Sequence, residues 1–132
     1  MEISVSQMQG RVPVIVLHIA GRINLGNASD IEQKARQIHE SGTHCLVLDM
    51  TQVESLTSAG LRVIHIIYKL FRDTTPPETD KEALDARDAS SIKSPYLKLA
   101  GPSPDIRRVL KIAGFELFLE IYDTVDEAVA SF

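Results

Sequence analysis

The segment Cys45–Arg72, CLVLDMTQVESLTSAGLRVIHIIYKLFR, contains the two patterns that decide the fold. It begins with an apolar run that stops on Asp49, and such a run without alternation is typical of a strand covered on both faces. From Ser58 onward, apolar residues recur at helical spacing. The segment therefore predicts a buried strand over 43–50 with Asp49 near its carboxyl end, a polar loop, and a helix from Ser58 to about Arg72.

The rest of the chain predicts the same alternation of short strands and helices. The expected elements are strands at 3–8 and 12–19, a loop at 22–27, a helix from Asn27 or Ser29 to about His39, a strand at 96–100, a helix from Ser103–Asp105 to Gly114, a strand at 117–122 and a helix at 125–132. The order ββαβαβαβα predicts an α/β fold, with a mixed, mostly parallel sheet and helices packed on it.

One stretch departs from this regular pattern. Residues 73–94 are rich in acidic residues, contain no aromatic residue, and include a Pro76-Pro77 pair that cannot continue a helix. A connection of this length without its own pattern is unusual in a compact domain. We interpret it as a mobile surface insertion in a single domain that covers residues 1–132.

Composition excludes several classes of protein. The chain has 132 residues, 44% of them hydrophobic, and a net charge of −4, so it has no basic field for direct nucleic-acid binding or for an acidic membrane surface. No apolar run approaches the ~20 residues that span a bilayer, so no membrane insertion is expected. The single cysteine, Cys45, excludes an internal disulfide framework. These features predict a cytoplasmic protein.

Three blocks of the sequence resemble the STAS domain, the fold of bacterial anti-sigma factor antagonists. Residues 46–62, LVLDMTQVESLTSAGLR, are similar to the family's apolar strand ending in Asp, followed by a loop and a helix start of the form Asp-Ser-Ser/Thr-Gly-Leu. Residues 100–115 and 121–128 resemble the family's later strand–helix segment and its terminal helix. The resemblance covers most of the chain except 73–94, and it implies a STAS fold.

The resemblance also implies a function and the residues that perform it. Asp49 matches the strand-end acid and Ser58 the phosphorylated serine, while Gly60-Leu61 match the Gly-Leu pair. Thr57 stands where many antagonists have Asp, and is itself a second possible phosphate acceptor. The expected partners are an anti-sigma factor that is also a serine kinase, which the unmodified protein sequesters, and a serine phosphatase that resets the switch.

The residues leave the role of Ser58 open. Thr57 or Ser58 would serve equally well as an ordinary helix cap. A phosphate at a helix N-terminus would nevertheless be tolerated by the fold, because free N–H groups and the helix dipole favour anions. It would also present a partner with a dianion at its binding surface. One hydroxyl could thus switch an interface without unfolding the domain.

The predicted helix carries a row of polar residues opposite its apolar face. Arg62, His65, Lys69 and Arg72, called here the basic stripe, continue from Ser58 at steps of four and three residues. A solvated helix face has the same pattern. The alternative is a docking surface for an acidic partner, with Arg62 close enough to hold a phosphate on Ser58. The resemblance adds Arg22 and Asn24, in the loop before the first helix, as further partner contacts. It also extends the expected partner-binding surface to Asp49, Thr57, Gly60 and Leu61.

The sequence favours a binding protein over an enzyme. Asp49 is expected to cap its loop, or, in the family reading, to shape the phosphorylation site. The four histidines are scattered and form no metal motif with Cys45, and no phosphate-cradling glycine loop is present in the sequence. No cofactor is expected, since ATP and magnesium belong to the kinase. The alternative function is an adaptor or structural STAS subunit of a stress-signalling or lipid-transport complex.

Overall fold

The protein folds around one five-stranded sheet with the strand order β1-β2-β3-β4-β5. The computed structural model describes residues 2–72, 96–117 and 119–132. Its elements are β1 (Glu2–Gln9), β2 (Pro13–Ile23), α1 (Ala28–Glu40), β3 (Leu46–Leu56), α2 (Ser58–Arg72), β4 (Leu97–Ala100), α4 (Pro104–Ile112), the 3-10 helix η2 (Phe115–Leu117), β5 (Glu120–Tyr122) and α5 (Val125–Ala130). Strands β1 and β2 pair antiparallel and the others pair parallel, which confirms the predicted α/β architecture.

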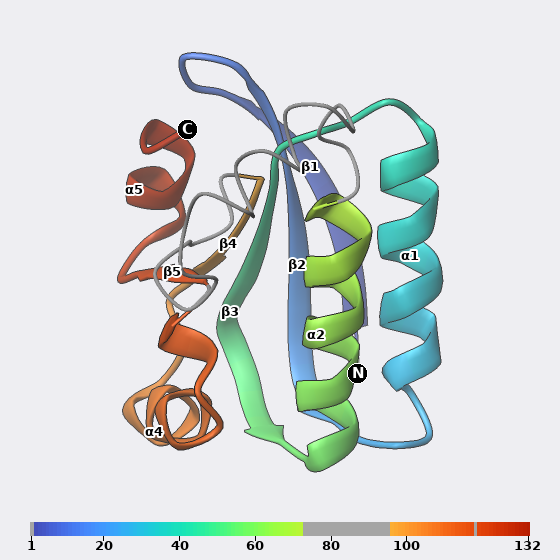
Figure 1. The fold of residues 1–132 in the computed structure, drawn as a ribbon, viewed down its shortest axis with the longest axis vertical. Coiled ribbons are helices and arrows are strands. Elements are labelled where there is room, and N and C mark those ends of the chain that lie inside the picture. Colours follow the sequence, from blue (N-terminus) through green and yellow to red (C-terminus); the bar gives the residue numbers. More distant parts are fainter. Residues whose placement is uncertain (1, 73–95, 118) are drawn as a thin grey trace, which may run out of the picture.

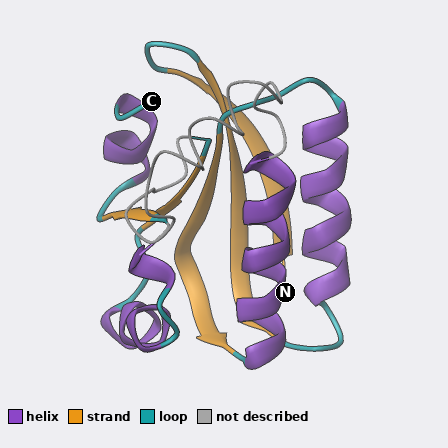
Figure 2. Ribbon diagram, viewed as in Figure 1, coloured by secondary structure: helices purple, strands orange, loops and turns teal. Residues whose placement is uncertain are grey.

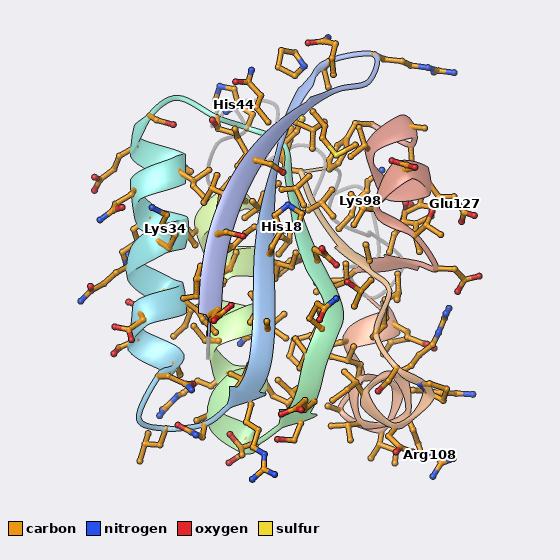
Figure 3. All side chains as sticks on the ribbon, turned by 180° about the vertical axis from the view of Figure 1, so that it is seen from behind. His18, Lys34, His44, Lys98, Arg108 and Glu127 are labelled. Atoms are coloured by element: carbon orange, nitrogen blue, oxygen red, sulfur yellow. The ribbon has the colours of Figure 1, made fainter. Side chains whose placement is uncertain are left out.

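Helices cover the two faces of the sheet unequally. Figure 1 shows α1 and α2 side by side on one face, and their apolar residues, with those of α4, form the larger core against the sheet. On the other face a smaller core joins Val16 and Val47 of the strands to Ala128 and Val129 of α5. Alternation along the strands sorts the side chains between the two cores. Figure 2 shows α1 and α2 in front of the strands, and Figure 3, from behind, shows that none of the described helices lies over much of the second face of β1 and β2.

The two central strands are longer than the sequence predicted. Strand β2 continues past Gly21, which has φ of 99°, to Ile23, and β3 continues past Asp49 to Leu56. The extra residues pair with each other through two register shifts, with Ile23 opposite Leu56. Cross-strand pairing therefore continues where local composition indicates a loop. Asp49 consequently lies inside β3, and its predicted position at the carboxyl end of the strand was wrong.

The C-terminal third also differs from expectation in one place. The strand predicted over 117–122 is shorter, because η2 follows α4 and only Glu120–Tyr122 pairs with β4. Gly114, with φ of 85°, ends the α4 region, and the turn after it buries Phe115. The predicted helix starts are confirmed: the hydroxyls of Ser103 and Thr124 accept hydrogen bonds from the N–H groups of Ile106 and Glu127.

Residues 73–94, predicted as a mobile insertion, lie outside the part of the chain that the structure describes. Within the described ranges, no helix has the length and apolar character needed to cross a lipid bilayer.

Candidate functional site

Ser58 is the first residue of α2, and the preceding residue fixes where that helix begins. The backbone N–H and the hydroxyl of Thr57 both donate to the carbonyl of Ile23, at 3.2 and 3.0 Å, and its own carbonyl accepts the N–H of Leu61. Thr57 thus ties the start of α2 to the end of β2. Because β3 ends at Leu56, the connection between strand and helix is short, and Ser58 is held at a defined place on the surface.

Gly60 allows this close approach. A Cβ atom at position 60 would lie 2.4 Å from Cδ1 of Leu56 and 2.9 Å from Cγ2 of Ile23, so a side chain there would require these two residues or the helix to shift. Gly60 is buried, and Leu61 is partly buried against the larger core. The Gly-Leu pair that the sequence analysis assigned to partner contact therefore sets the position of the first helical turn.

The hydroxyls of Ser58 and Thr57 differ in their availability. Both residues are exposed, but the Thr57 hydroxyl is already engaged with Ile23. Among the described residues, none forms a hydrogen bond with the Ser58 side chain. Modifying Thr57 would break the bond that anchors α2, whereas modifying Ser58 would leave that anchor intact. The geometry therefore favours Ser58 over Thr57 as a phosphate acceptor.

The surroundings of Ser58 are suited to a negative charge. The first hydrogen bond of α2 runs from Leu61 to Thr57, so the N–H groups of residues 58–60 have no partner within the helix. The first turn contains no acidic residue. Arg62, one turn further on, is exposed, and no ion pair joins it to another described residue. These donors and the helix dipole together form a site that attracts an anion.

An open groove adjoins Ser58 between the starts of α1 and α2. Its volume is about 600 Å³, and its floor is mainly apolar, from Ala28, Ala59, Val63 and Ile66. Leu25 stands at the edge with 84% of its surface exposed. Ser58, Arg62 and Glu32 supply polar groups around the groove, and Glu32 is held by Arg36 at 3.0 Å. We call this the α1–α2 groove; sequence analysis did not identify it, although an isolated leucine in a polar loop was a signal.

The basic stripe is exposed as far as the structure describes it. Arg62, His65 and Lys69 are all exposed on α2, and the ring of His65 stacks on Tyr68. The side chain of Arg72 lies outside the described atoms. The stripe thus leads away from Ser58 along the outer face of α2, while the α1–α2 groove lies at its beginning.

The side chains of the loop between β2 and α1 mainly form hydrogen bonds within that loop. The side-chain oxygens of Asn24 and Asn27 each accept a backbone N–H of this loop: Oδ1 of Asn27 accepts the N–H of Asn24, and Oδ1 of Asn24 accepts the N–H of Gly26. The amide of Asn27 donates to the carbonyl of Arg22. Arg22 is exposed, with Glu54 at 3.9 Å. These bonds shape the loop that presents Leu25 beside α1.

Asp49 does not lie near Ser58. It is buried on the other face of the sheet, where its Oδ2 lies 2.6 Å from Nδ1 of His18 and its Oδ1 accepts the N–H and hydroxyl of Thr51, at 3.0 and 2.7 Å. Burial alone raises the pKa of Asp49, but the hydrogen bonds from Thr51 and His18 outweigh it, so its pKa lies below the ordinary value. The expected role of Asp49 in shaping the phosphorylation site therefore has no support in the geometry.

His18 continues this network to a serine. Its Nε2 lies 2.7 Å from Oγ of Ser6 on β1, so Ser6, His18 and Asp49 form a nucleophile–base pair with an orienting acid. The sequence analysis found no such pair, because the three residues belong to three different strands. The one available signal was the presence of polar side chains in otherwise apolar strands. No group of three potential metal ligands forms among the described residues.

Comparison with known proteins gives a consistent result. A model of the STAS domain family matches residues 6–75, more than half of the chain. The chain is 23% identical over 132 residues to a Bordetella bronchiseptica protein provisionally named anti-sigma factor antagonist BtrV, covering 100% of this chain and 95% of that protein.

Solved structures share the fold. A Thermotoga maritima protein provisionally assigned as an anti-sigma factor antagonist has a TM-score of 0.74 and 21% identity, over 96% of this chain and 90% of its own. The Bacillus cell fate determinant SpoIIAA, solved in its phosphorylated form, has a TM-score of 0.61 and 16% identity, over 97% of this chain and 96% of its own.

Proposed function

Since the chain belongs to the STAS domain family, we propose that it is an anti-sigma factor antagonist whose binding surface is switched by phosphorylation of Ser58. In this mechanism the unmodified protein binds an anti-sigma factor and so frees a sigma factor. The anti-sigma factor is also a serine kinase, which transfers phosphate from ATP to Ser58 and is then released. A serine phosphatase removes the phosphate. The chain acts as a regulator and substrate, and the kinase supplies ATP and magnesium.

One observation carries the proposal: at the N-terminus of α2, an exposed hydroxyl that no described residue engages lies beside an open apolar groove. Ser58 and Arg62 both line that groove. An apolar floor supplies the area that drives association, and a few polar groups at its edge supply orientation. A modification at this edge acts directly on whatever occupies the groove.

The physical effect of phosphate follows from these surroundings. Phosphorylation adds about −1.5 to −2 charge and three acceptor oxygens. The free N–H groups of the first turn and the Arg62 guanidinium can stabilise that charge, so the fold persists. A partner in the groove must instead desolvate a dianion or accept its repulsion. The partner also loses access to Arg62, which now pairs with the phosphate.

The proposed docking surface consists of the α1–α2 groove, the basic stripe and the loop before α1 that carries Arg22 and Asn24. Of the partner contacts that the sequence analysis predicted, this docking surface includes Arg22, Asn24, Ser58, Arg62, His65 and Lys69. Thr57, Gly60 and Leu61 act by positioning Ser58, and Asp49 lies on the other face of the sheet. An exposed cationic row beside an apolar groove suits a partner surface with one prominent apolar side chain and flanking carboxylates.

The test uses the intact protein and its candidate kinase. The protein is incubated with the kinase, ATP and magnesium, and wild type and Ser58→Ala are compared by intact mass and peptide mapping. We expect one phosphate on wild type, located on Ser58, and none on Ser58→Ala. Binding to the kinase is then measured by titration calorimetry before and after phosphorylation, and we expect modification to abolish it.

Other outcomes distinguish the alternatives. Phosphate that persists on Ser58→Ala would place the acceptor at Thr57 or in residues 73–94. Wild type that binds its partner without being phosphorylated would favour the adaptor or structural subunit of a stress-signalling or lipid-transport complex. Binding that is unaffected by a phosphate on Ser58 would contradict the switch.

A further inference from the structure

A second polar array crosses the sheet on the face that α1 and α2 do not cover. It joins β1, β2 and β3 through two short hydrogen bonds: Ser6 Oγ to His18 Nε2 at 2.7 Å, and His18 Nδ1 to Asp49 Oδ2 at 2.6 Å. Val16 and Val47 lie two residues before His18 and Asp49 and belong to the smaller core, so all four side chains point to that face. Figure 3 shows His18 on this side of the sheet.

The hydrogen bonds define the protonation pattern of the array. Asp49 is ionised, because its pKa lies below the ordinary value, and a carboxylate only accepts. Nδ1 of His18 therefore carries the proton that it shares with Asp49, and in the tautomer with this single ring proton Nε2 accepts the Ser6 hydroxyl. Thr51 holds the other carboxylate oxygen with two donors and so fixes the orientation of Asp49. In this arrangement His18 can accept the proton of Ser6 while Asp49 orients the imidazole ring, and such an arrangement activates a serine.

The array is partly open to solvent. His18 keeps 35% of its side-chain surface exposed, and Ser6 is partly exposed. An open depression of about 750 Å³ is lined by His18, Asp49 and Ser4, and Ser6 adjoins it through its hydrogen bond to His18 rather than by lining it. Its lining is mixed in polarity, and Glu2 is the other ionisable residue in it. An acidic lining disfavours anionic ligands and leaves room for neutral ones.

We propose that Ser6 is a reactive serine, and that His18 and Asp49 activate it for acyl transfer from small uncharged esters of carboxylic acids. Ser6 Oγ attacks the carbonyl carbon while its proton passes to Nε2 of His18. The bond to the leaving oxygen then breaks, and His18 returns the proton to that oxygen, so an alcohol leaves and an acyl-Ser6 remains. Water, deprotonated by His18 in the same way, releases the carboxylic acid and restores the hydroxyl.

The test measures acylation of the whole protein by p-nitrophenyl acetate. Release of p-nitrophenol is followed by absorbance, and intact mass and peptide mapping locate the acetyl group. A positioned general base contributes about 10² to 10⁴ in rate, so we expect Ser6→Ala and His18→Gln each to lower acylation by about 100-fold. Asp49→Asn keeps the size of the side chain but removes its charge, and should also slow acylation.

Ser4 is an internal control on the same strand. It lies opposite His18 in the strand register, yet none of the described residues forms a hydrogen bond with its hydroxyl. The acetyl group should therefore be found on Ser6 and not on Ser4. Thermal melts establish that each variant is folded. Equal acylation of wild type and a folded His18→Gln variant, or acetyl groups spread over lysines and other serines, would overturn the proposal.

Discussion

The hydroxyl of Thr57 donates to the carbonyl of Ile23 at 3.0 Å, across 34 positions of sequence, and so joins the start of α2 to the end of β2. This bond separates the roles of two adjacent hydroxyl residues. Thr57 anchors the helix, while Ser58 remains exposed beside the α1–α2 groove. A modification of Ser58 can therefore change the surface of the domain without loosening its scaffold.

Replacement of the anchor should cost stability but preserve the acceptor. Thr57→Val removes the hydroxyl while keeping the shape, and we expect the free energy of unfolding to fall by about 1 kcal/mol. Urea unfolding measures this change. Ser58→Ala is the matched control and should change stability by less than about 0.5 kcal/mol. If Thr57→Val abolished phosphorylation while the protein stayed folded, Thr57 would be the acceptor.

A side chain at position 60 should push α2 away from the strand ends. Alanine is ordinarily favoured over glycine in a helix by about 1 kcal/mol, but overpacking against Leu56 and Ile23 costs about 1–3 kcal/mol. We expect Gly60→Ala to be net destabilising in thermal or urea unfolding. Leu56→Val should relieve part of the clash. The loss of stability in the double variant should therefore be smaller than the sum of the losses in the two single variants. A stabilised Gly60→Ala would contradict the close packing.

Charge reversal on the basic stripe should weaken partner binding. Arg62→Glu removes the cation beside Ser58 and adds repulsion toward an acidic partner, so we expect roughly a ten-fold rise in Kd with little change in Tm. Arg108→Glu makes the same charge change on exposed α4, outside the proposed surface (Figure 3), and should leave Kd unchanged. Equal affinities for Arg62→Glu and wild type would remove the stripe from the docking surface.

The α1–α2 groove should depend on its exposed leucine. Leu25→Asp places a charge where an apolar partner side chain is expected, and we predict a loss of at least about 2 kcal/mol in binding free energy. Ile112→Asp is a close match, because Ile112 on α4 is 80% exposed and Leu25 is 84% exposed. Titration calorimetry with the binding partner compares the affinities of wild type, Leu25→Asp and Ile112→Asp. Similar losses in both variants would indicate a general effect of surface charge.

The carboxylate of Asp49 should make stability depend on pH in acid. Its pKa is lower in the folded protein than in the unfolded chain, so its contribution is complete above the unfolded value, about 3.9, and is lost as pH falls through the folded value. Asp49→Asn lacks this contribution. The stability difference between wild type and Asp49→Asn should therefore shrink as the pH falls below about 4. A difference that grew in acid would contradict the lowered pKa.

Sequence patterns predicted most of the fold because its elements carry local signals. Alternation and apolar runs located the strands, and cap residues such as Ser103 located helix starts. The errors occurred where pairing between distant segments decided the outcome. Strand β3 continues through polar residues to Leu56 because β2 pairs with it, and the strand expected at 117–122 is shortened by η2.

The candidate site was predicted in part for the same reason. Ser58 and Arg62 are one helical turn apart, so sequence spacing alone places them together. Leu25 and Val63 line the same α1–α2 groove only because α1 and α2 pack side by side. The bond between Asp49 and His18 could not be predicted, since a strand shows which face a residue takes only once its neighbours are known.

The sequence by itself determined the order of strands and helices, the family resemblance and the position of Ser58 at a helix start, because these depend on short-range periodicity and capping. The tertiary structure alone decided that Thr57 is an anchor, that a groove opens beside Ser58, and that Ser6, His18 and Asp49 lie in one array. Each of these depends on contacts between strands or helices that are distant in the chain, and such contacts leave no periodic signal in the sequence.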